Sequence, residues 1–121
     1  MSVVFFGSRE MGAAVLKQLV EDHIDVSLVV VPVVTLNFDK YTVSLAMSNS
    51  IPFAVHYPIY TDSLHKLVSK FAPSLCIMCC YDYKIPDSVI DLCPNFVNVH
   101  PGKLPEYRGP TPVQWQLYNG E

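Results

Sequence analysis

Five short apolar segments, with helical or turn patterns between them, constrain the fold of this chain more than any other feature. They cover residues 2–6, 25–31, 52–56, 75–80 and 96–99. The first has no polar alternation, which is typical of a strand covered on both faces. Strands that alternate with helices predict an α/β fold, a Rossmann-like parallel sheet with flanking helices. Right-handed crossovers give an expected strand order of 3-2-1-4-5 in one domain.

Prolines, capping residues and helical spacing predict finer boundaries. Pro32 is expected to stop the second strand because proline cannot donate to a sheet ladder, which leaves residues 33–39 irregular. Thr61 or Asp62 is expected to cap the helix that Pro73 ends. Apolar residues at helical spacing predict two buried helix faces, Val43, Leu45, Ala46 and Met47 in residues 41–49, and Leu64, Leu67, Val68 and Phe71 in the next helix.

Composition restricts the partners and the compartment. Half of the residues are apolar and 16% are charged, which favours a folded chain with a modest core. The formal net charge of −3 predicts no broad basic surface for nucleic acid. The longest apolar run, residues 26–34, is too short to span a bilayer, and no signal peptide is predicted. These features favour a cytoplasmic protein without a membrane partner, and His23, His56 and His65 are predicted to be surface residues.

Four cysteines raise the question of a metal or redox site. Cys76 and Cys79 have suitable spacing, but they lie inside an apolar run that predicts a strand. Residues three apart on a strand face opposite sides, so these two cannot easily chelate one ion or pair. No second Cys or His pair completes a zinc site, so we predict no metal. Buried free thiols are expected at all four positions, Cys76, Cys79, Cys80 and Cys93.

Residues 96–109 concentrate the side chains best suited to chemistry at a carbonyl. Asn98 and His100 alternate onto one face of a short strand, and Val97 and Val99 point to the other face, where they can bury. An Asn amide can bind an oxygen that becomes negative in a tetrahedral intermediate. A His can donate or take a proton at neutral pH. Taken alone, the pair also fits a packed, hydrogen-bonded histidine.

The order of residues in this stretch resembles the signature of the formyltransferases that use 10-formyltetrahydrofolate. The matching string is Asn98-x-His100-Pro101-Gly102-x-Leu104-Pro105-x-Tyr107-Arg108-Gly109, followed by Trp115 and Asn119-Gly120-Glu121. The resemblance extends to the first apolar strand and its Gly7-Ser8 turn. Residues 80–86 are similar to the family's Ala-Tyr-Gly-x-x-x-Pro loop, which carries part of the folate pterin site. Tyr81 and Pro86 match that loop, and Asp82 replaces its glycine.

The resemblance implies that residues 1–121 are the N-terminal portion of a catalytic domain with 10-formyltetrahydrofolate as the formyl donor. Asn98 would hold the formyl oxygen, and His100 would stabilise or protonate the tetrahedral species. Tyr81, Ile85 and Pro86 would bind the folate. The Asp that orients the family's His, and the family's remaining strands, would lie beyond residue 121. The sheet of this chain is therefore expected to be incomplete at the C-terminus, and the chain alone is expected to have little or no transferase activity. An inactive fragment that binds folate or a nucleotide remains the alternative.

The acceptor is also implied by resemblance. Residues 33–40, where methionyl-tRNA formyltransferases carry a Gly/Arg/Lys-rich insertion, contain one basic residue. Residues 102–109 look most like the sugar-nucleotide N-formyltransferases, so a nucleotide-linked aminosugar is the predicted substrate and methionyl-tRNA the alternative. A sheet edge at the fifth strand would allow a homodimer. The candidate substrate-binding residues are Arg9, Tyr107, Arg108 and Gly109, each of which also fits a purely structural role.

Overall fold

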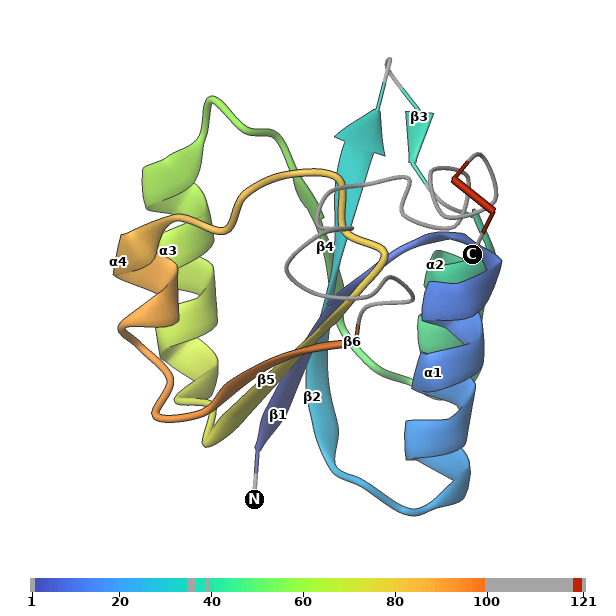
Figure 1. Ribbon diagram of the computed structural model, residues 1–121. Helices are drawn as coiled ribbons and strands as arrows, with labels where there is room; N and C mark the ends of the chain where they lie inside the picture. Colours follow the sequence, from blue (N-terminus) through green and yellow to red (C-terminus); the bar gives the residue numbers. More distant parts are fainter. Residues whose placement is uncertain (1, 35–36, 39, 100–118, 121) are drawn as a thin grey trace.

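The computed structural model describes residues 2–34, 37–38, 40–99 and 119–120. In these ranges a sheet lies between two pairs of helices, α3 and α4 on one side and α1 and α2 on the other (Figure 1). The strands are β1 (Val3–Gly7), β2 (Val26–Val34), β3 (Asn37–Phe38), β4 (Phe53–His56), β5 (Leu75–Cys79) and β6 (Phe96–Val99). The helices are α1 (Arg9–Glu21), α2 (Lys40–Ser48), α3 (Thr61–Phe71) and α4 (Asp87–Ile90).

The parallel strands are ordered β4-β2-β1-β5-β6, which confirms the expected order of 3-2-1-4-5 and the Rossmann-like class. β1 lies at the centre, where Phe5 pairs with Val29 of β2 and Ile77 of β5. The chain crosses the α1/α2 face on one side of β1 and the α3/α4 face on the other. In such sheets this switch leaves a crevice at the carboxyl ends of the two strands that flank it, here β1 and β5.

Each central strand is apolar on both faces because each face is covered by helices. Val4 and Phe6 of β1 belong to the core under α3 and α4, whereas Phe5, between them, belongs to the core under α1 and α2. The same alternation divides Val30 and Val29 of β2. This double burial accounts for the unbroken apolar runs in the sequence. No helix in the described ranges combines the length and hydropathy that a bilayer crossing requires.

Pro32 does not end its strand, so this prediction was wrong. β2 continues to Val34 and turns into an antiparallel pairing with β3. The backbone N–H of Val29 donates to the carbonyl of Pro52, so every second residue of β2 from Val29 directs its N–H toward β4. Position 32 falls in the other set, which faces β1, and the register with β1 ends at Val30. The missing N–H of Pro32 therefore costs no ladder hydrogen bond.

Two helix predictions need correction in detail. In α2 the buried residues are Thr42, Val43 and Ala46, whereas Met47 is exposed and Leu45 is half-buried, because the helix packs only a narrow face on the sheet. α3 begins at Thr61 with Tyr60 at the N-cap position and without a side-chain cap. A turn closed by the Tyr60 N–H on the Tyr57 carbonyl precedes it. The predicted apolar face of α3 is confirmed, with Leu64 and Val68 buried and Leu67 and Phe71 packed beside them.

Cys76 and Cys79 face opposite sides of β5, as the strand geometry predicted. Cys76 belongs to the core under α3 and α4, and Cys79 to the core under α1 and α2, so β5 separates the two thiols. Cys93 is buried beside Cys76, whereas Cys80 is only half-buried, which corrects the expectation that all four are buried. The described residues contain no cluster of His, Cys, Asp and Glu able to hold a metal ion.

We expect Cys80 to be modified first when the native protein is treated with a thiol reagent. Burial raises the pKa of the Cys76 thiol, and it raises the pKa of Cys79 to about 12, so neither supplies thiolate at neutral pH. Mass spectrometry after brief treatment with iodoacetamide should find one modified site, and four after unfolding. The variant Cys80→Ser is the control and should remove the native reaction. Modification of Cys79 as fast as Cys80 would contradict this prediction.

Candidate active site

The candidate site begins at the turn between β1 and α1, where two glycines allow a close approach to β5. A Cβ atom on Gly7 would lie 2.9 Å from the Cys79 carbonyl oxygen, and one on Gly12 would lie 3.2 Å from the same atom. Ser8 binds the end of β5 directly, because its N–H donates to the Cys79 carbonyl and its hydroxyl donates to the Cys80 carbonyl at 2.5 Å. These donors fix the turn against β5 rather than pointing toward a ligand.

Residues 80–86 connect β5 to α4 and lie next to this turn. They are called the folate loop below, only because they resemble the loop that was predicted to bind folate. Asp82 stands in this loop where the resembling family has glycine, but its φ is not positive. The left-handed residue is Cys80, with φ 54°. The presence of Asp82 in place of the family's glycine therefore introduces no backbone strain.

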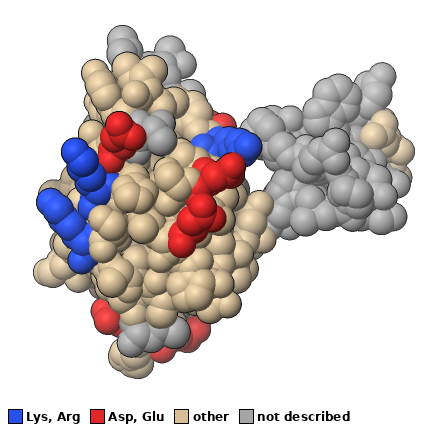
Figure 2. Space-filling model, turned by 90° about the vertical axis from the view of Figure 1, so that its left-hand side faces the viewer, with Lys and Arg blue, Asp and Glu red and all other residues tan. Residues whose placement is uncertain are grey.

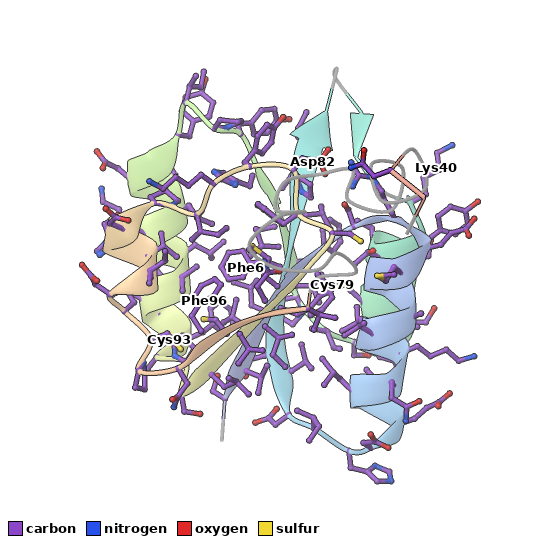
Figure 3. The ribbon with its side chains drawn as sticks, in the orientation of Figure 1. Phe6, Lys40, Cys79, Asp82, Cys93 and Phe96 are labelled. Atoms are coloured by element: carbon purple, nitrogen blue, oxygen red, sulfur yellow. The ribbon has the colours of Figure 1, made fainter. Side chains whose placement is uncertain are left out.

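Arg9, a predicted substrate-binding residue, pairs with this loop. Its Nη2 atom lies 2.7 Å from Oδ2 of Asp82, and Asp82 lies at the upper end of the sheet in Figure 3. Oδ1 of Asp82 is buried and has no hydrogen-bond partner among the described residues. Because the Arg9 side chain is half exposed, the pair contributes at most about 1 kcal/mol to stability. Its clearer effect is to join the N-terminus of α1 to the folate loop.

Tyr81 packs between two aromatic rings. Its ring meets Phe6 edge-on with centroids 5.7 Å apart, and stacks on His56 at 5.8 Å. The Tyr81 hydroxyl lies 2.6 Å from Nδ1 of His56. Burial raises the pKa of Tyr81 and lowers that of His56, so both groups are neutral at pH 7. In the Nε2–H tautomer, Nδ1 accepts the hydrogen bond that the Tyr81 hydroxyl donates.

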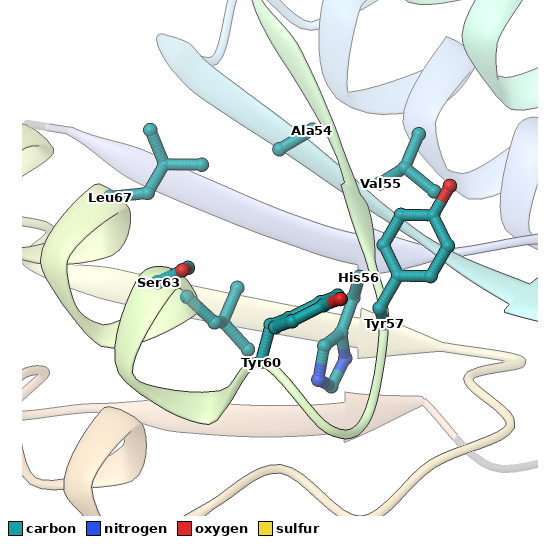
Figure 4. A pocket seen from close by; sticks show the side chains of 8 residues that line it. Ala54, Val55, His56, Tyr57, Tyr60, Ser63 and Leu67 are labelled. Atoms are coloured by element: carbon teal, nitrogen blue, oxygen red, sulfur yellow. The ribbon is translucent and has the colours of Figure 1, made fainter.

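His56 is the residue that sequence reasoning missed. It was predicted to lie on the surface, but only 4% of it is exposed. Its position at the end of an apolar segment indicated the carboxyl end of a strand. Its hydrogen-bond partner, Tyr81, lies 25 residues further along the chain, so no local signal in the sequence reports this contact. On its other side His56 lines a pocket of about 150 Å³ between β4 and α3, together with Tyr57, Tyr60 and Ser63 (Figure 4).

Tyr83 and Ile85 of the folate loop have structural partners as well. The Tyr83 hydroxyl donates to the Val33 carbonyl of β2, and its ring meets His56 edge-on at 5.8 Å. Ile85, a predicted wall for the pterin, is 3% exposed and belongs to the core under α3 and α4. Pro86 is half-buried at the N-cap position of α4. The Ile85 side chain therefore faces the protein interior, and the Tyr81 ring packs on Phe6 and His56.

Asn98 lies on β6, paired with Met78 of β5, and its side chain is exposed. It shares a strand face with Phe96, whose ring lies 5.6 Å from that of Phe6. The other predicted residues of this stretch, His100, Tyr107, Arg108 and Gly109, lie outside the described residues. The site that the structure assembles therefore consists of the α1 turn, the folate loop and Asn98 at neighbouring strand ends.

The two valines of β6 are not buried, contrary to the prediction. Val97 is 49% exposed and Val99 is 38% exposed. Among the described helices, α1 covers this face of the sheet, and it packs on β1 and β5 rather than on β6. The alternation of β6 was therefore read correctly, but the face that holds Val97 and Val99 lacks a covering helix in the described part of the chain.

We expect the protein to lose stability as the pH falls below about 6.5. Burial lowers the pKa of His56, so the unfolded chain, with a His pKa of ~6.5, takes up this proton at a higher pH than the folded chain. The contribution of neutral His56 to the free energy of unfolding is complete above pH ~6.5, and it is lost as the pH falls toward the lowered pKa of the folded protein. Urea unfolding between pH 7.5 and 5 measures the slope. His56→Gln should flatten it, and an unchanged slope in that variant would exclude His56 as the cause.

Comparison with known proteins gives the chain its family. The sequence model of the family described as "Formyl transferase" matches residues 1–121. The chain belongs to this family. It is 30% identical to methionyl-tRNA formyltransferase of Acetivibrio thermocellus over all of its own length and 41% of that protein, and 29% identical to the Orientia tsutsugamushi enzyme of the same name over 42%. It thus spans about two fifths of the length of these curated relatives.

Solved structures of similar proteins agree on the fold. Glycinamide ribonucleotide transformylase 1 from Symbiobacterium toebii superposes with a TM-score of 0.78 at 18% identity, over all of this chain and 61% of that one. Phosphoribosylglycinamide formyltransferase from Bacillus halodurans gives a TM-score of 0.79 at 15% identity, over all of this chain and 66% of that one. At such identities these likenesses support the Rossmann-like fold alone.

Proposed function

We propose that this chain is the N-terminal portion of a catalytic domain that transfers a formyl group from 10-formyltetrahydrofolate to an amine. The observation that carries the proposal is the family match over residues 1–121. The geometry is compatible with it, because the folate loop and Asn98 lie at neighbouring strand ends beside the crevice of the sheet. The reaction would join the amine nitrogen to the formyl carbon, break the bond from that carbon to N10 of the folate, and move one proton from the amine to N10.

The residues would divide this work between binding and chemistry. The Asn98 side-chain NH₂ would donate to the formyl oxygen as it becomes negative, which is the role of an oxyanion-hole donor. The exposure of Asn98 leaves this donor accessible to a substrate. His100, two positions further on, would donate or accept the proton. The folate loop would hold the pterin through its backbone, since the side chains of Tyr81 and Ile85 pack inward.

We propose a nucleotide-linked aminosugar as the acceptor. Residues 33–40 contain one basic residue, and the net charge of the chain is −3, so the chain offers little positive charge to a tRNA backbone. On the face over α3 and α4, basic side chains lie beside acidic ones, and uncharged side chains cover much of the remaining surface (Figure 2). A neutral surface of this kind favours a small substrate over a polyanion.

Methionyl-tRNA is the second candidate acceptor, because the curated relatives named above are methionyl-tRNA formyltransferases. The two acceptors are distinguished on a preparation with measurable formyl transfer, because this chain alone is expected to have little activity. That preparation is incubated with 10-formyltetrahydrofolate and each acceptor, and mass spectrometry detects a gain of one formyl group. Formylation of an aminosugar nucleotide supports the first candidate. Formylation of methionyl-tRNA, with tight and salt-sensitive binding in a gel shift, would exclude it. Failure to bind any folate would contradict the proposed function as a whole.

A further inference from the structure

Three consecutive residues of the folate loop are each held by a different element of the fold. The Tyr81 hydroxyl binds His56 at the end of β4, and Asp82 pairs with Arg9 at the start of α1. The Tyr83 hydroxyl binds the Val33 carbonyl near the end of β2. The partners belong to β4 and β2, which lie on the other side of β1 from the loop, and to the first turn of α1. The loop is therefore held by three different elements.

The loop needs this support because its backbone is not in a locally preferred conformation. Cys80, its first residue, has φ 54°, a left-handed value that is unfavourable for a non-glycine residue. Conformations of this kind persist where the surrounding structure determines them, and they are common where a backbone must meet a ligand. The Ser8 hydroxyl on the Cys80 carbonyl is one such determinant, and the anchored side chains of residues 81–83 supply the others.

His56 is central to these anchors. It hydrogen-bonds Tyr81, stacks on the ring of that residue and meets the ring of Tyr83 edge-on. The Tyr81 ring is enclosed between His56 and Phe6, so it is not available to stack on a pterin. Tyr81 therefore acts on a ligand only through the backbone of the loop that it fixes. His56 is the acceptor on which that fixation depends.

We propose that His56 is a positioning residue for the formyl donor, because its Nδ1 atom holds Tyr81 and thereby the backbone of the folate loop in the conformation that receives the folate. This inference rests on the proposed function. His56 itself would not touch the donor. Nothing in the sequence assigned it this role, since it was predicted to be a surface residue.

The same arrangement makes donor binding depend on pH. A protonated imidazole carries a proton on both nitrogens, so it cannot accept the Tyr81 hydrogen bond. Tyr57 and Tyr60 line the pocket on its α3 side, and Tyr81 and Tyr83 face it from the loop. Of the charged residues that the structure describes on these elements, Asp82 pairs with Arg9, whereas Lys84 of the loop and Asp62 at the start of α3 are exposed to solvent. Donor affinity is therefore expected to fall as the pH drops from 7.5 toward 5.5.

The test measures binding of 5-formyltetrahydrofolate, a stable formylated folate, by calorimetry on the protein and its variants at one chain length. Tyr81→Phe removes the donor of the hydrogen bond and should weaken binding about 2- to 10-fold, the range expected for one such bond. His56→Gln places an uncharged amide oxygen near the position of Nδ1. It should bind close to the wild-type level at pH 7.5 and lose the pH dependence. Tyr57→Phe, at an exposed ring on the same pocket, is the matched control and should bind normally.

Thermal unfolding of each variant distinguishes a positioning role from a general loss of fold. Weakened binding by Tyr81→Phe with an intact unfolding transition, together with a flat pH profile in His56→Gln, supports the inference. Unchanged binding in Tyr81→Phe, or a wild-type pH profile in His56→Gln, overturns it while leaving the proposed function intact. A wild-type protein that binds no folate overturns the proposed function and the inference with it.

Discussion

Replacing Phe6 by alanine is expected to lower the free energy of unfolding by about 3–5 kcal/mol, the range for deleting a buried aromatic ring. Phe6 has no exposed surface and lies on the central strand, where Figure 3 shows it near Phe96. Its ring contacts those of Tyr81 and Phe96, so its removal leaves a cavity between β1, β6 and the folate loop. The rigid sheet cannot close such a cavity, because its strand positions are fixed by hydrogen bonds on both sides.

Urea unfolding followed by circular dichroism measures the change as a lower midpoint with an unchanged slope. Phe53→Ala is the matched control, since Phe53 is also a strand phenylalanine but is 39% exposed on β4. That variant should lose much less stability. An equal loss in the two variants would show that the ring contacts around Phe6 contribute little beyond ordinary strand burial.

The sequence predicted the parallel sheet because its central strands are apolar on both faces, a property local to each segment. Val4 and Phe5 read as buried without any knowledge of which helix covers which side. Strand order then followed from the handedness of crossovers. Pro32 was misread because the cost of a missing N–H depends on which neighbour that N–H would face. That neighbour, the end of β1 at Gly7, is 25 residues away along the chain from Pro32.

In the candidate site, too, the residues that a local motif identifies were predicted, and the contacts between distant residues were not. Asn98 and the folate loop were found because ordered Pro and Gly positions resemble a family signature, which is now confirmed as the formyl transferase family. The contacts that hold the loop were not predicted. The pairs His56 with Tyr81, Arg9 with Asp82, and the Tyr83 hydroxyl with the Val33 carbonyl join residues that are 25, 73 and 50 positions apart in the chain. No periodicity or spacing within a segment reports such pairs, since only the topology brings the three strand ends together.

Replacing Asn98 by alanine is expected to lower kcat for formyl transfer about 10²- to 10³-fold, the range for losing one oxyanion-hole donor. The change in KM should be small, because the amide would contact the formyl oxygen most strongly when that oxygen becomes negative. Asn98 is exposed, so its truncation removes no core contact and the unfolding transition should stay in place. Steady-state kinetics on a preparation with measurable formyl transfer provides the test.

The control for Asn98 is a second asparagine at the start of the same strand. Asn95 precedes β6, is exposed, and makes a side-chain hydrogen bond to the Ser74 carbonyl at 3.4 Å, away from the strand's carboxyl end. Asn95→Ala should therefore retain nearly the wild-type kcat. A loss below tenfold in Asn98→Ala, or an equal loss in both variants, would mean that Asn98 is not the oxyanion donor. The chemistry would then have to be sought in the crevice between the α1 turn and the folate loop.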